Sequence, residues 1–283
     1  MQRIIMPILR TGMFLLVLFS VITCKKSTST NNGTPSASYS YTSNGASSVT
    51  FTSTSTNSPT SFQWNFGDGT TGTGNPVTHV YKMDSGFAVK LTVSNSEGSS
   101  STTDTFQKLA NIHTRFGDML MWLDNQTPLY KRNYLGLADT GFYDSTTFHR
   151  IVQNFVIQGG DPLSKNPNNP NVGTGGPGYT IPFLYVQQLT HVYGAVGAAS
   201  TGAGQPGNGS QFYIVVNPQG EHTLDGSYPI FGLIINGMNV AVNISNQPQN
   251  SANNMPLSRI TMAVKTVIIS NADLKGKYGF TPY

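Results

Sequence analysis

The most informative stretch of this sequence is FHRIVQNFVIQGGDP, at residues 148–162. Two short apolar runs flank the polar pair Gln153-Asn154, which predicts two β-strands joined by a tight turn. Arg150 and Gln158 are eight residues apart, an even spacing that would place both side chains on one face of a single straight strand. Because a turn separates the two runs, the spacing favours a shared face without fixing it. Adjacent strand residues point to opposite faces, which places His149 in the core or at its rim if Arg150 faces a pocket.

The two polar side chains of this stretch are hydrogen-bond donors with no nucleophile between them. Arg150 stays protonated and offers a planar fork of N–H groups to a carbonyl or a carboxylate, and Gln158 adds an amide. Four aromatic residues are available to line an apolar pocket beside them: Phe148, Phe155, Phe212 and Tyr213. One fixed cation, one amide and several rings suit a compact apolar group next to a peptide carbonyl, and proline is such a group.

Several common catalytic motifs are absent from the sequence. It contains no HExxH, no pair of cysteines for zinc, no P-loop and no GxSxG elbow. The run GTGGPG at residues 173–178 is predicted to be a plain loop, because no strand precedes it closely and Pro177 interrupts any helix after it. His149 is predicted to be structural rather than a general base acting with Asp144 or Asp161.

Composition favours a turn-rich β protein without a nucleic-acid partner. The 283 residues include 30 Gly and 16 Pro, and only 10% are charged. The formal charge of +4 falls to +2 without Arg3 and Arg10, which lie in a leader, because 14 basic and 12 acidic side chains remain. No basic cluster exceeds Lys25-Lys26 or Lys131-Arg132, whereas nucleic-acid binding needs a basic patch.

The N-terminal residues have the pattern of a bacterial export signal. Basic residues precede the apolar run MFLLVLFSVI at residues 13–22, which is too short to span a bilayer comfortably. The single cysteine, Cys24, follows at once and resembles the lipidated cysteine of lipoproteins; an ordinary signal peptide is the alternative. We expect a signal peptide over residues 1–23, a membrane anchor at Cys24 on the bacterial cell envelope, and a flexible Ser/Thr-rich tether over residues 24–36.

Short runs of alternating apolar and polar residues over residues 37–107 predict antiparallel strands. Three motifs occur in order: WNFGDG at 64–69, HVY at 79–81 and LTVSN at 91–95. This part of the chain resembles a polycystic-kidney-disease (PKD) repeat, which implies an immunoglobulin-like β-sandwich. Asp68 lacks the further acidic residues that a calcium site requires, so it is predicted to form a turn, and His79 is predicted to be structural. No metal site is predicted.

The second half of the chain, residues 108–273, is predicted to carry the chemistry. Alternation over residues 116–123 predicts a strand, and the spacing of Leu129, Tyr134, Leu135 and Leu137 predicts one amphipathic helix over 128–138. Further motifs are FYD at 142–144, GYTIP at 178–182, GSQFYI at 209–214, LDG at 224–226 and FG at 231–232. Together with residues 148–161 they resemble a cyclophilin, a peptidyl-prolyl cis-trans isomerase. The resemblance implies a mainly β fold in which a closed eight-stranded antiparallel barrel with two capping helices follows the sandwich and precedes a tail at 274–283.

The resemblance also implies roles for particular residues. Arg150 matches the catalytic arginine, which donates to the proline nitrogen in the twisted transition state, and Gln158 matches a glutamine that binds substrate backbone and orients the arginine. The implied substrate-binding residues are Phe155, Val156, Ala199, Ser200, Gln211, Tyr213, Leu224 and Tyr228. No metal or organic cofactor is implied, and the implied partners are proline-containing peptides and unfolded exported proteins.

Several matched positions depart from the familiar eukaryotic pattern. Tyr213 replaces a phenylalanine, Val156 a methionine and Ser200 an asparagine, while Thr223 and Tyr228 replace a tryptophan and a histidine. We therefore expect weak or no binding of cyclosporin. Two other functions stay open: a cyclophilin-like peptide-binding protein with vestigial catalysis, and an adhesion protein whose main function lies in the PKD-like repeat.

Overall fold

The computed structural model describes residues 33–45, 47–82 and 86–282. The predicted signal peptide and Cys24 lie outside these residues. Within the described ranges, no helix is long and apolar enough to cross a membrane. Thr34 and Ser36 already contact the first domain, because the Thr34 carbonyl accepts from Asn57 at 2.8 Å and Ser36 forms a β-bridge with Thr56.

The first domain is a β-sandwich of two antiparallel sheets. One sheet has the order β1-β2-β5, and the facing sheet begins β4-β3-β6-β7. The bounds are β1 Tyr39–Gly45, β2 Ser48–Ser53, β3 Ser61–Asn65, β4 Thr71–Thr73, β5 Val77–Val80, β6 Phe87–Asn95 and β7 Gly98–Thr114. The alternating residues face inward as the sequence predicts: Val49, Phe51, Trp64, Leu91 and Phe106 are almost fully buried. The immunoglobulin-like sandwich of a PKD domain is the fold observed.

The turn at Asp68 joins the paired strands β3 and β4. The Asp68 carboxylate accepts from the Thr70 backbone N–H at 3.0 Å and lies 2.7 Å from Nε2 of His79. The His79 ring also stacks on Phe66, with ring centroids 4.1 Å apart. Both side chains therefore have structural partners within the turn and the neighbouring strands.

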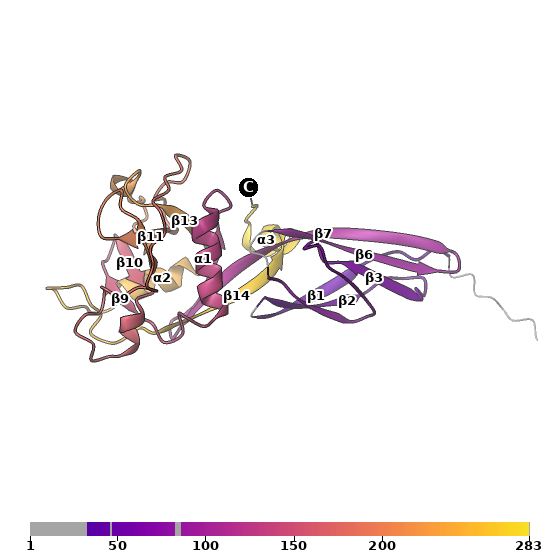
Figure 1. Ribbon diagram of the computed structural model, residues 1–283, viewed down its shortest axis with the longest axis horizontal. Coiled ribbons are helices and arrows are strands. Elements are labelled where there is room, and N and C mark those ends of the chain that lie inside the picture. Colours follow the sequence, from indigo (N-terminus) through magenta and orange to yellow (C-terminus); the bar gives the residue numbers. More distant parts are fainter. Residues whose placement is uncertain (1–32, 46, 83–85, 283) are drawn as a thin grey trace, which may run out of the picture. The chain divides into compact units, whose positions relative to one another are not determined.

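The second domain continues the antiparallel sheet beyond β7 and adds three helices. Its strands are β8 Gly117–Leu123, β9 Phe148–Ile151, β10 Val156–Gly159, β11 Ala195–Ser200, β12 Gly207–Val215, β13 Ile230–Asn236 and β14 Met262–Ser270. Its helices are α1 Pro128–Asp139, α2 Met238–Ser245 and α3 Asn271–Tyr278, with short 3-10 turns at Pro162–Lys165 and His222–Leu224. Helix α1 packs on β14 and β12, and α2 packs on β8 and β10 (Figure 1).

Helix α1 confirms the predicted helix and part of its predicted buried face, because Tyr134 and Leu135 are buried and Leu137 is half-buried. It begins after Thr127, with Pro128 at the first helical position, where a missing N–H costs nothing. Tyr130, Tyr134, Leu135 and Ala138 form the buried face, whereas Leu129 is 51% exposed. Aromatic packing decides the face, because Tyr134 contacts Tyr143, Phe212 and Phe231.

The predicted closed eight-stranded barrel is not formed as a continuous ladder among the described strands. The order β7-β8-β13-β11-β12-β10-β9 is regular, and β14 pairs with the outer edge of β7. Between β9 and β14, the contacts are one isolated bridge from Thr147 to Thr261 and flanking backbone bonds such as Phe148 N–H to the Ile260 carbonyl at 2.9 Å. A third helix, α3, also adds to the two that were expected, and its Leu274 is fully buried.

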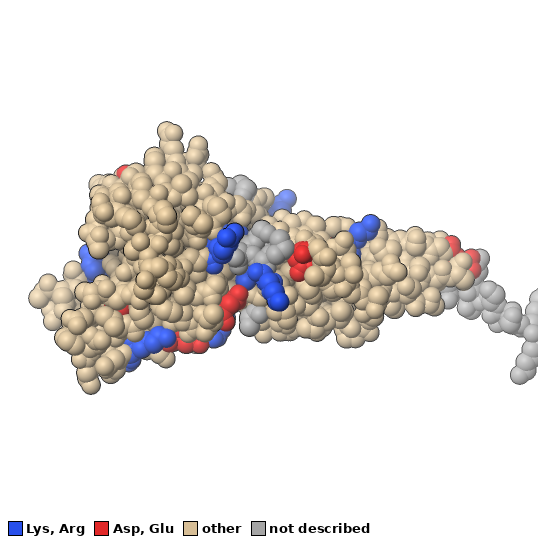
Figure 2. Space-filling model, viewed as in Figure 1, with Lys and Arg blue, Asp and Glu red and all other residues tan. Residues whose placement is uncertain are grey.

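One strand belongs to both domains. β7 pairs with β6 from Gly98 to Phe106 and with β8 from Ala110 to Thr114, and β14 pairs with it over residues 106–114. The chain therefore passes from one domain to the other without a linker. Figure 2 shows few charged side chains on the visible face. Several basic and acidic side chains lie beside one another near the middle of the view, and wide uncharged areas surround them, as the composition implies.

Candidate active site

Strands β9 and β10 bring Arg150 and Gln158 together. The two residues are direct cross-strand partners in the β9–β10 hairpin, so their side chains leave the same face of the sheet. The turn includes Asn154 with a φ of 54°, a left-handed conformation that asparagine tolerates better than most residues. The predicted hairpin is confirmed, and its register supplies the pairing that the sequence left as suggestive.

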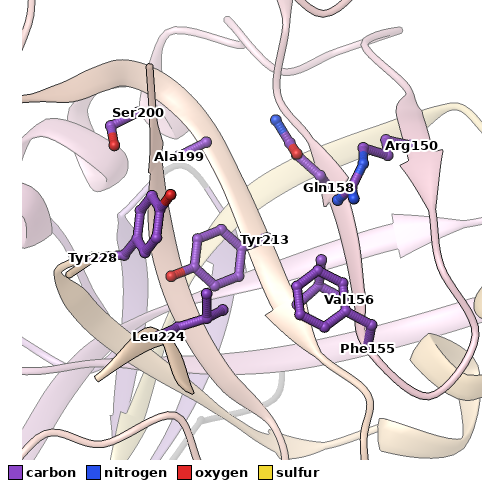
Figure 3. Close-up of a pocket in the computed structure, with 9 residues that line it drawn as sticks. All are labelled: Arg150, Phe155, Val156, Gln158, Ala199, Ser200, Tyr213, Leu224 and Tyr228. Atoms are coloured by element: carbon purple, nitrogen blue, oxygen red, sulfur yellow. The ribbon is translucent and has the colours of Figure 1, made fainter. Parts of the chain in front are cut away.

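A pocket of about 260 Å³ lies beside this pair. Nine of the ten predicted site residues line it (Figure 3): Arg150, Phe155, Val156, Gln158, Ala199, Ser200, Tyr213, Leu224 and Tyr228. They come from the β9–β10 hairpin, from the end of β11, from β12, and from the segment that follows β12. Arg150 and Gln158 occupy one side of the pocket, Leu224 and Tyr228 occupy the opposite side, and Tyr213 lies between them.

The guanidinium of Arg150 is available to a ligand. Its Cζ lies 5.7 Å from the ring centroid of Phe155, a cation–π distance. In the part of the chain that the structure describes, this guanidinium forms no ion pair and no hydrogen bond. Burial lowers the pKa of Arg150 below its usual value of 12.5, because desolvation disfavours the charged form. An arginine with such a high intrinsic pKa still remains protonated at neutral pH.

The tenth predicted residue, Gln211, holds Gln158 in place. Gln158 Nε2 donates to Gln211 Oε1 at 3.0 Å. Gln211 Nε2 in turn donates to the carbonyls of Gly173 and Gly175, at 3.0 and 2.7 Å. Among the described residues, the carbonyl oxygen of the Gln158 amide accepts no hydrogen bond, and the 173–175 loop sets the orientation of both amides.

His149 lies on β9 beside Arg150, but it is buried with only 6% of its surface exposed and does not line the pocket. Burial lowers the pKa of His149, so the neutral ring is favoured. Among the residues that the structure describes, no group of three or more His, Cys, Asp or Glu side chains could hold a metal ion. The side chains that line the pocket are an arginine, an amide, the hydroxyl of Ser200 and a set of apolar or aromatic groups.

Comparison with known proteins matches both halves of the chain to families. Residues 109–267 match the model of the cyclophilin type peptidyl-prolyl cis-trans isomerases, and residues 30–109 match the PKD domain. The fold and the pocket thus define a cyclophilin domain preceded by a PKD domain. The chain belongs to the cyclophilin-type peptidyl-prolyl cis-trans isomerase family.

Its relatives come from bacteria and eukaryotes. Peptidyl-prolyl cis-trans isomerase B of Bacillus subtilis is 41% identical over 114 residues, which cover 40% of this chain and 73% of that protein. Peptidyl-prolyl cis-trans isomerase cypE of Dictyostelium discoideum is 32% identical over 56% of this chain and 97% of its own. A crystal structure of a cyclophilin type isomerase from Cryptosporidium parvum is similar with a TM-score of 0.51 at 33% identity, and covers 59% of this chain and 99% of that one. The same parasite protein has also been crystallised in the presence of the dipeptide Ala-Pro, with a TM-score of 0.50.

Proposed function

We propose that this protein catalyses cis-trans isomerisation of X-Pro peptide bonds, with Arg150 and Gln158 as the catalytic residues. The observation that carries the proposal is the free guanidinium of Arg150, paired across the hairpin with Gln158, beside a pocket of about 260 Å³ walled by Phe155, Tyr213 and Leu224. The pocket has room for a proline ring, and the arginine then faces the peptide bond that precedes it.

The mechanism requires only selective binding of the twisted amide. Rotation about the peptide bond destroys amide resonance, and the barrier is about 18–20 kcal/mol. At the top of the barrier the proline nitrogen regains a lone pair, so an N–H donor from Arg150 binds this state more strongly than either planar form. Gln158 holds the substrate backbone, and Phe155, Val156, Tyr213, Leu224 and Tyr228 hold the ring. Ala199 and Ser200 contact the residues that precede the proline, and Gln211 orients Gln158 from behind the pocket.

The direct test is the isomerisation rate of a short X-Pro peptide. Arg150→Ala should lower kcat/KM by roughly 10²- to 10³-fold, the size of effect seen when one preorganised donor is removed. Arg115→Ala is the matched control, because Arg115 also lies over a phenylalanine, Phe116, but is exposed and outside the pocket. A folded native protein that accelerates nothing would refute the isomerase proposal; if it still binds the peptide, the function is peptide recognition.

The same proposal covers the closure of the barrel and the place of the protein in the cell. We propose that the bridge between Thr147 and Thr261 completes an eight-stranded barrel in solution, that Cys24 is lipidated, and that the protein assists the folding of exported proteins at the bacterial envelope. The support is the leader pattern of residues 1–24 and the backbone bonds between β9 and β14. Cys24→Ser should move the protein from the detergent phase to the aqueous phase in a phase-partition assay. A wild-type protein that stays in the aqueous phase would exclude the anchor.

We further propose that cyclosporin binds weakly or not at all, because Thr223 and Tyr228 stand where the drug meets a tryptophan and a histidine in the familiar pattern. Calorimetric titration of the protein with cyclosporin measures this. A tight nanomolar complex would contradict the proposal without affecting the role of Arg150.

A further inference from the structure

The hydroxyl of Tyr213 has a buried partner behind the pocket. Tyr213 is 6% exposed and its ring forms one wall of the pocket. Its hydroxyl lies 2.7 Å from Nε2 of His191, which is fully buried. The two rings are nearly parallel, with an interplanar angle of 6°. Figure 3 shows this hydroxyl directed toward Leu224 and Tyr228, away from Arg150.

The other ring nitrogen of His191 is held by Asp225. Oδ1 of Asp225 lies 2.7 Å from His191 Nδ1 and accepts the backbone N–H of His191, also at 2.7 Å. The second carboxylate oxygen lies 2.8 Å from Nδ1 of His222. Burial acts to raise the pKa of Asp225, but the hydrogen bonds from His191 and His222 outweigh it and lower this pKa, so the carboxylate is ionised at neutral pH.

These contacts define the direction of each hydrogen bond. An ionised carboxylate can only accept, so Nδ1 of His191 carries a proton. Burial lowers the pKa of His191, which keeps the ring neutral and leaves Nε2 as an acceptor. The Tyr213 hydroxyl therefore donates to His191, and the order of the chain is Tyr213 to His191 to Asp225.

Strand β11 leaves room for this arrangement only because residue 197 is glycine. A Cβ built on Gly197 would collide with Cζ and the hydroxyl oxygen of Tyr213. The φ of Gly197 is ordinary, so the requirement is for space rather than for backbone freedom. The phenol is thus confined between the β11 backbone and His191.

We propose that His191 and Asp225 are positioning residues of the proline pocket, which fix the ring of Tyr213 through its hydroxyl. The inference rests on the proposed isomerase function and deepens it. A phenylalanine at position 213 would fill nearly the same volume without this restraint. Misplacement of a pocket wall by a fraction of an ångström weakens transition-state binding. The hydrogen bonds from Tyr213 to His191 and from His191 to Asp225 therefore contribute to kcat/KM, although neither His191 nor Asp225 touches the substrate.

A kinetic double-mutant cycle on the whole protein tests this. Tyr213→Phe and His191→Leu should each lower kcat/KM roughly 5- to 30-fold, because each leaves one buried polar partner unpaired or the ring unrestrained. The double variant should be less impaired than the product of the two factors, since removal of both partners leaves no orphaned group. Peptide affinity measured by NMR should fall with kcat/KM, because the pocket itself is altered. His113→Leu is the matched control: His113 also pairs with an aspartate, Asp118 at 2.8 Å, but both are exposed.

Two outcomes would overturn the proposal. One is that the two single effects multiply fully in the double variant, because His191 would then act independently of the Tyr213 hydroxyl. The other comes from ¹⁵N NMR of the native protein, which needs no variant to fold: His191 must be neutral at pH 7 with its proton on Nδ1, and the opposite tautomer would refute the chain. If the native protein isomerises nothing, the isomerase proposal fails. The His191 tautomer and a double-mutant cycle on peptide affinity still test whether His191 and Asp225 position the ring of Tyr213.

Discussion

Gly197 is the residue on which the shape of the pocket wall depends most directly. Its substitution by alanine forces Cβ into the phenol of Tyr213. We expect Gly197→Ala to lower the free energy of unfolding by about 1–3 kcal/mol, as overpacking does, and to lower kcat/KM more than about tenfold. Gly136→Ala is the control, because a Cβ there meets no atom within 4 Å and α1 should gain stability. Equal effects of the two substitutions on urea unfolding would show that residue 197 is not crowded.

Two buried histidines make the protein sensitive to acid. Burial lowers the pKa of both His149 and His191 below the usual 6.5. The unfolded state therefore binds more protons than the folded state just below pH 6.5. The free energy of unfolding is therefore highest above pH 6.5, where both histidines are neutral in the folded and the unfolded state. It falls as the pH drops from 6.5 through the lower pKa of the folded state. The slope approaches about 1.4 kcal/mol per pH unit for each histidine.

His149→Leu should flatten this decline. His149 is the useful choice because neither of its ring nitrogens has a hydrogen-bond partner among the described residues. Urea unfolding at pH 7.5 and pH 5 gives the comparison. A variant with the same loss of stability as the native protein would contradict the assignment of this acid sensitivity to His149.

At the scale of an element, the loop over residues 161–175 is held by one carboxylate. Asp161 is fully buried; one oxygen accepts the Leu163 N–H at 2.7 Å, and the other accepts the N–H groups of Gly173 and Gly175. The same two glycines present their carbonyls to Gln211. The loop thus links a buried acid to the amides of the active site, a role different from the phosphate binding that its glycines superficially suggest.

Asp161→Asn should therefore affect both stability and catalysis. The amide places N–H groups against the N–H groups of the loop, so we expect a loss of about 2–3 kcal/mol and a lower kcat/KM as the Gln158 amide loses its orientation. The exposed Asp118→Asn should change stability by less than about 0.5 kcal/mol. A destabilised Asp161→Asn protein with unchanged kcat/KM would show that the 161–175 loop does not set the orientation of the Gln158 amide.

At the scale of the whole molecule, the PKD and cyclophilin domains share a polar junction between a buried lysine, Lys108, and the partly exposed Asp139. Nζ of Lys108, on β7, lies 2.7 Å from Asp139, and its side chain is 1% exposed. Asp139 also accepts hydrogen bonds from Ser47 of the sandwich and Thr266 of β14. A carboxylate in the last turn of α1 opposes the helix dipole, so its place is explained by these tertiary contacts rather than by the helix.

Breaking this junction should uncouple the domains. Asp139→Ala leaves the buried Lys108 without this carboxylate. We expect a loss of about 1–3 kcal/mol, less than for a fully buried pair because solvent reaches Asp139. The two tryptophans report on the domains separately, because Trp64 lies in the sandwich core and Trp122 lies on β8. Fluorescence of Trp122→Phe and Trp64→Phe proteins in urea should give coincident transitions with Asp139 present and separate ones without it. Separate transitions with Asp139 present would show that the domains unfold independently.

The sequence by itself determined most of the secondary structure and the composition of the pocket. The β9–β10 hairpin, helix α1 and the alternating strands of the sandwich follow from local periodicity, which the chain carries wherever it folds. Arg150 and Gln158 were identified because both lie within one short stretch whose order of residues is distinctive. Of the four aromatic residues that were expected to line the pocket, Phe155 and Tyr213 do so, whereas Phe148 and Phe212 lie in the core. The family resemblance supplied the remaining lining residues, Val156, Ala199, Ser200, Leu224 and Tyr228.

Only the tertiary structure decided what lies behind and between these residues. His191, Gly197 and Asp225 come from segments without shared periodicity, and they meet at Tyr213 because strand pairing brings distant parts of the chain together. The exposure of Leu129 on α1, the incomplete ladder between β9 and β14 and the junction at Asp139 were not predicted for the same reason. Hydrogen-bond partners and packing surfaces depend on which distant strands pair and in which register. Local periodicity does not contain this information, because pairing is decided by contacts between segments far apart in the chain.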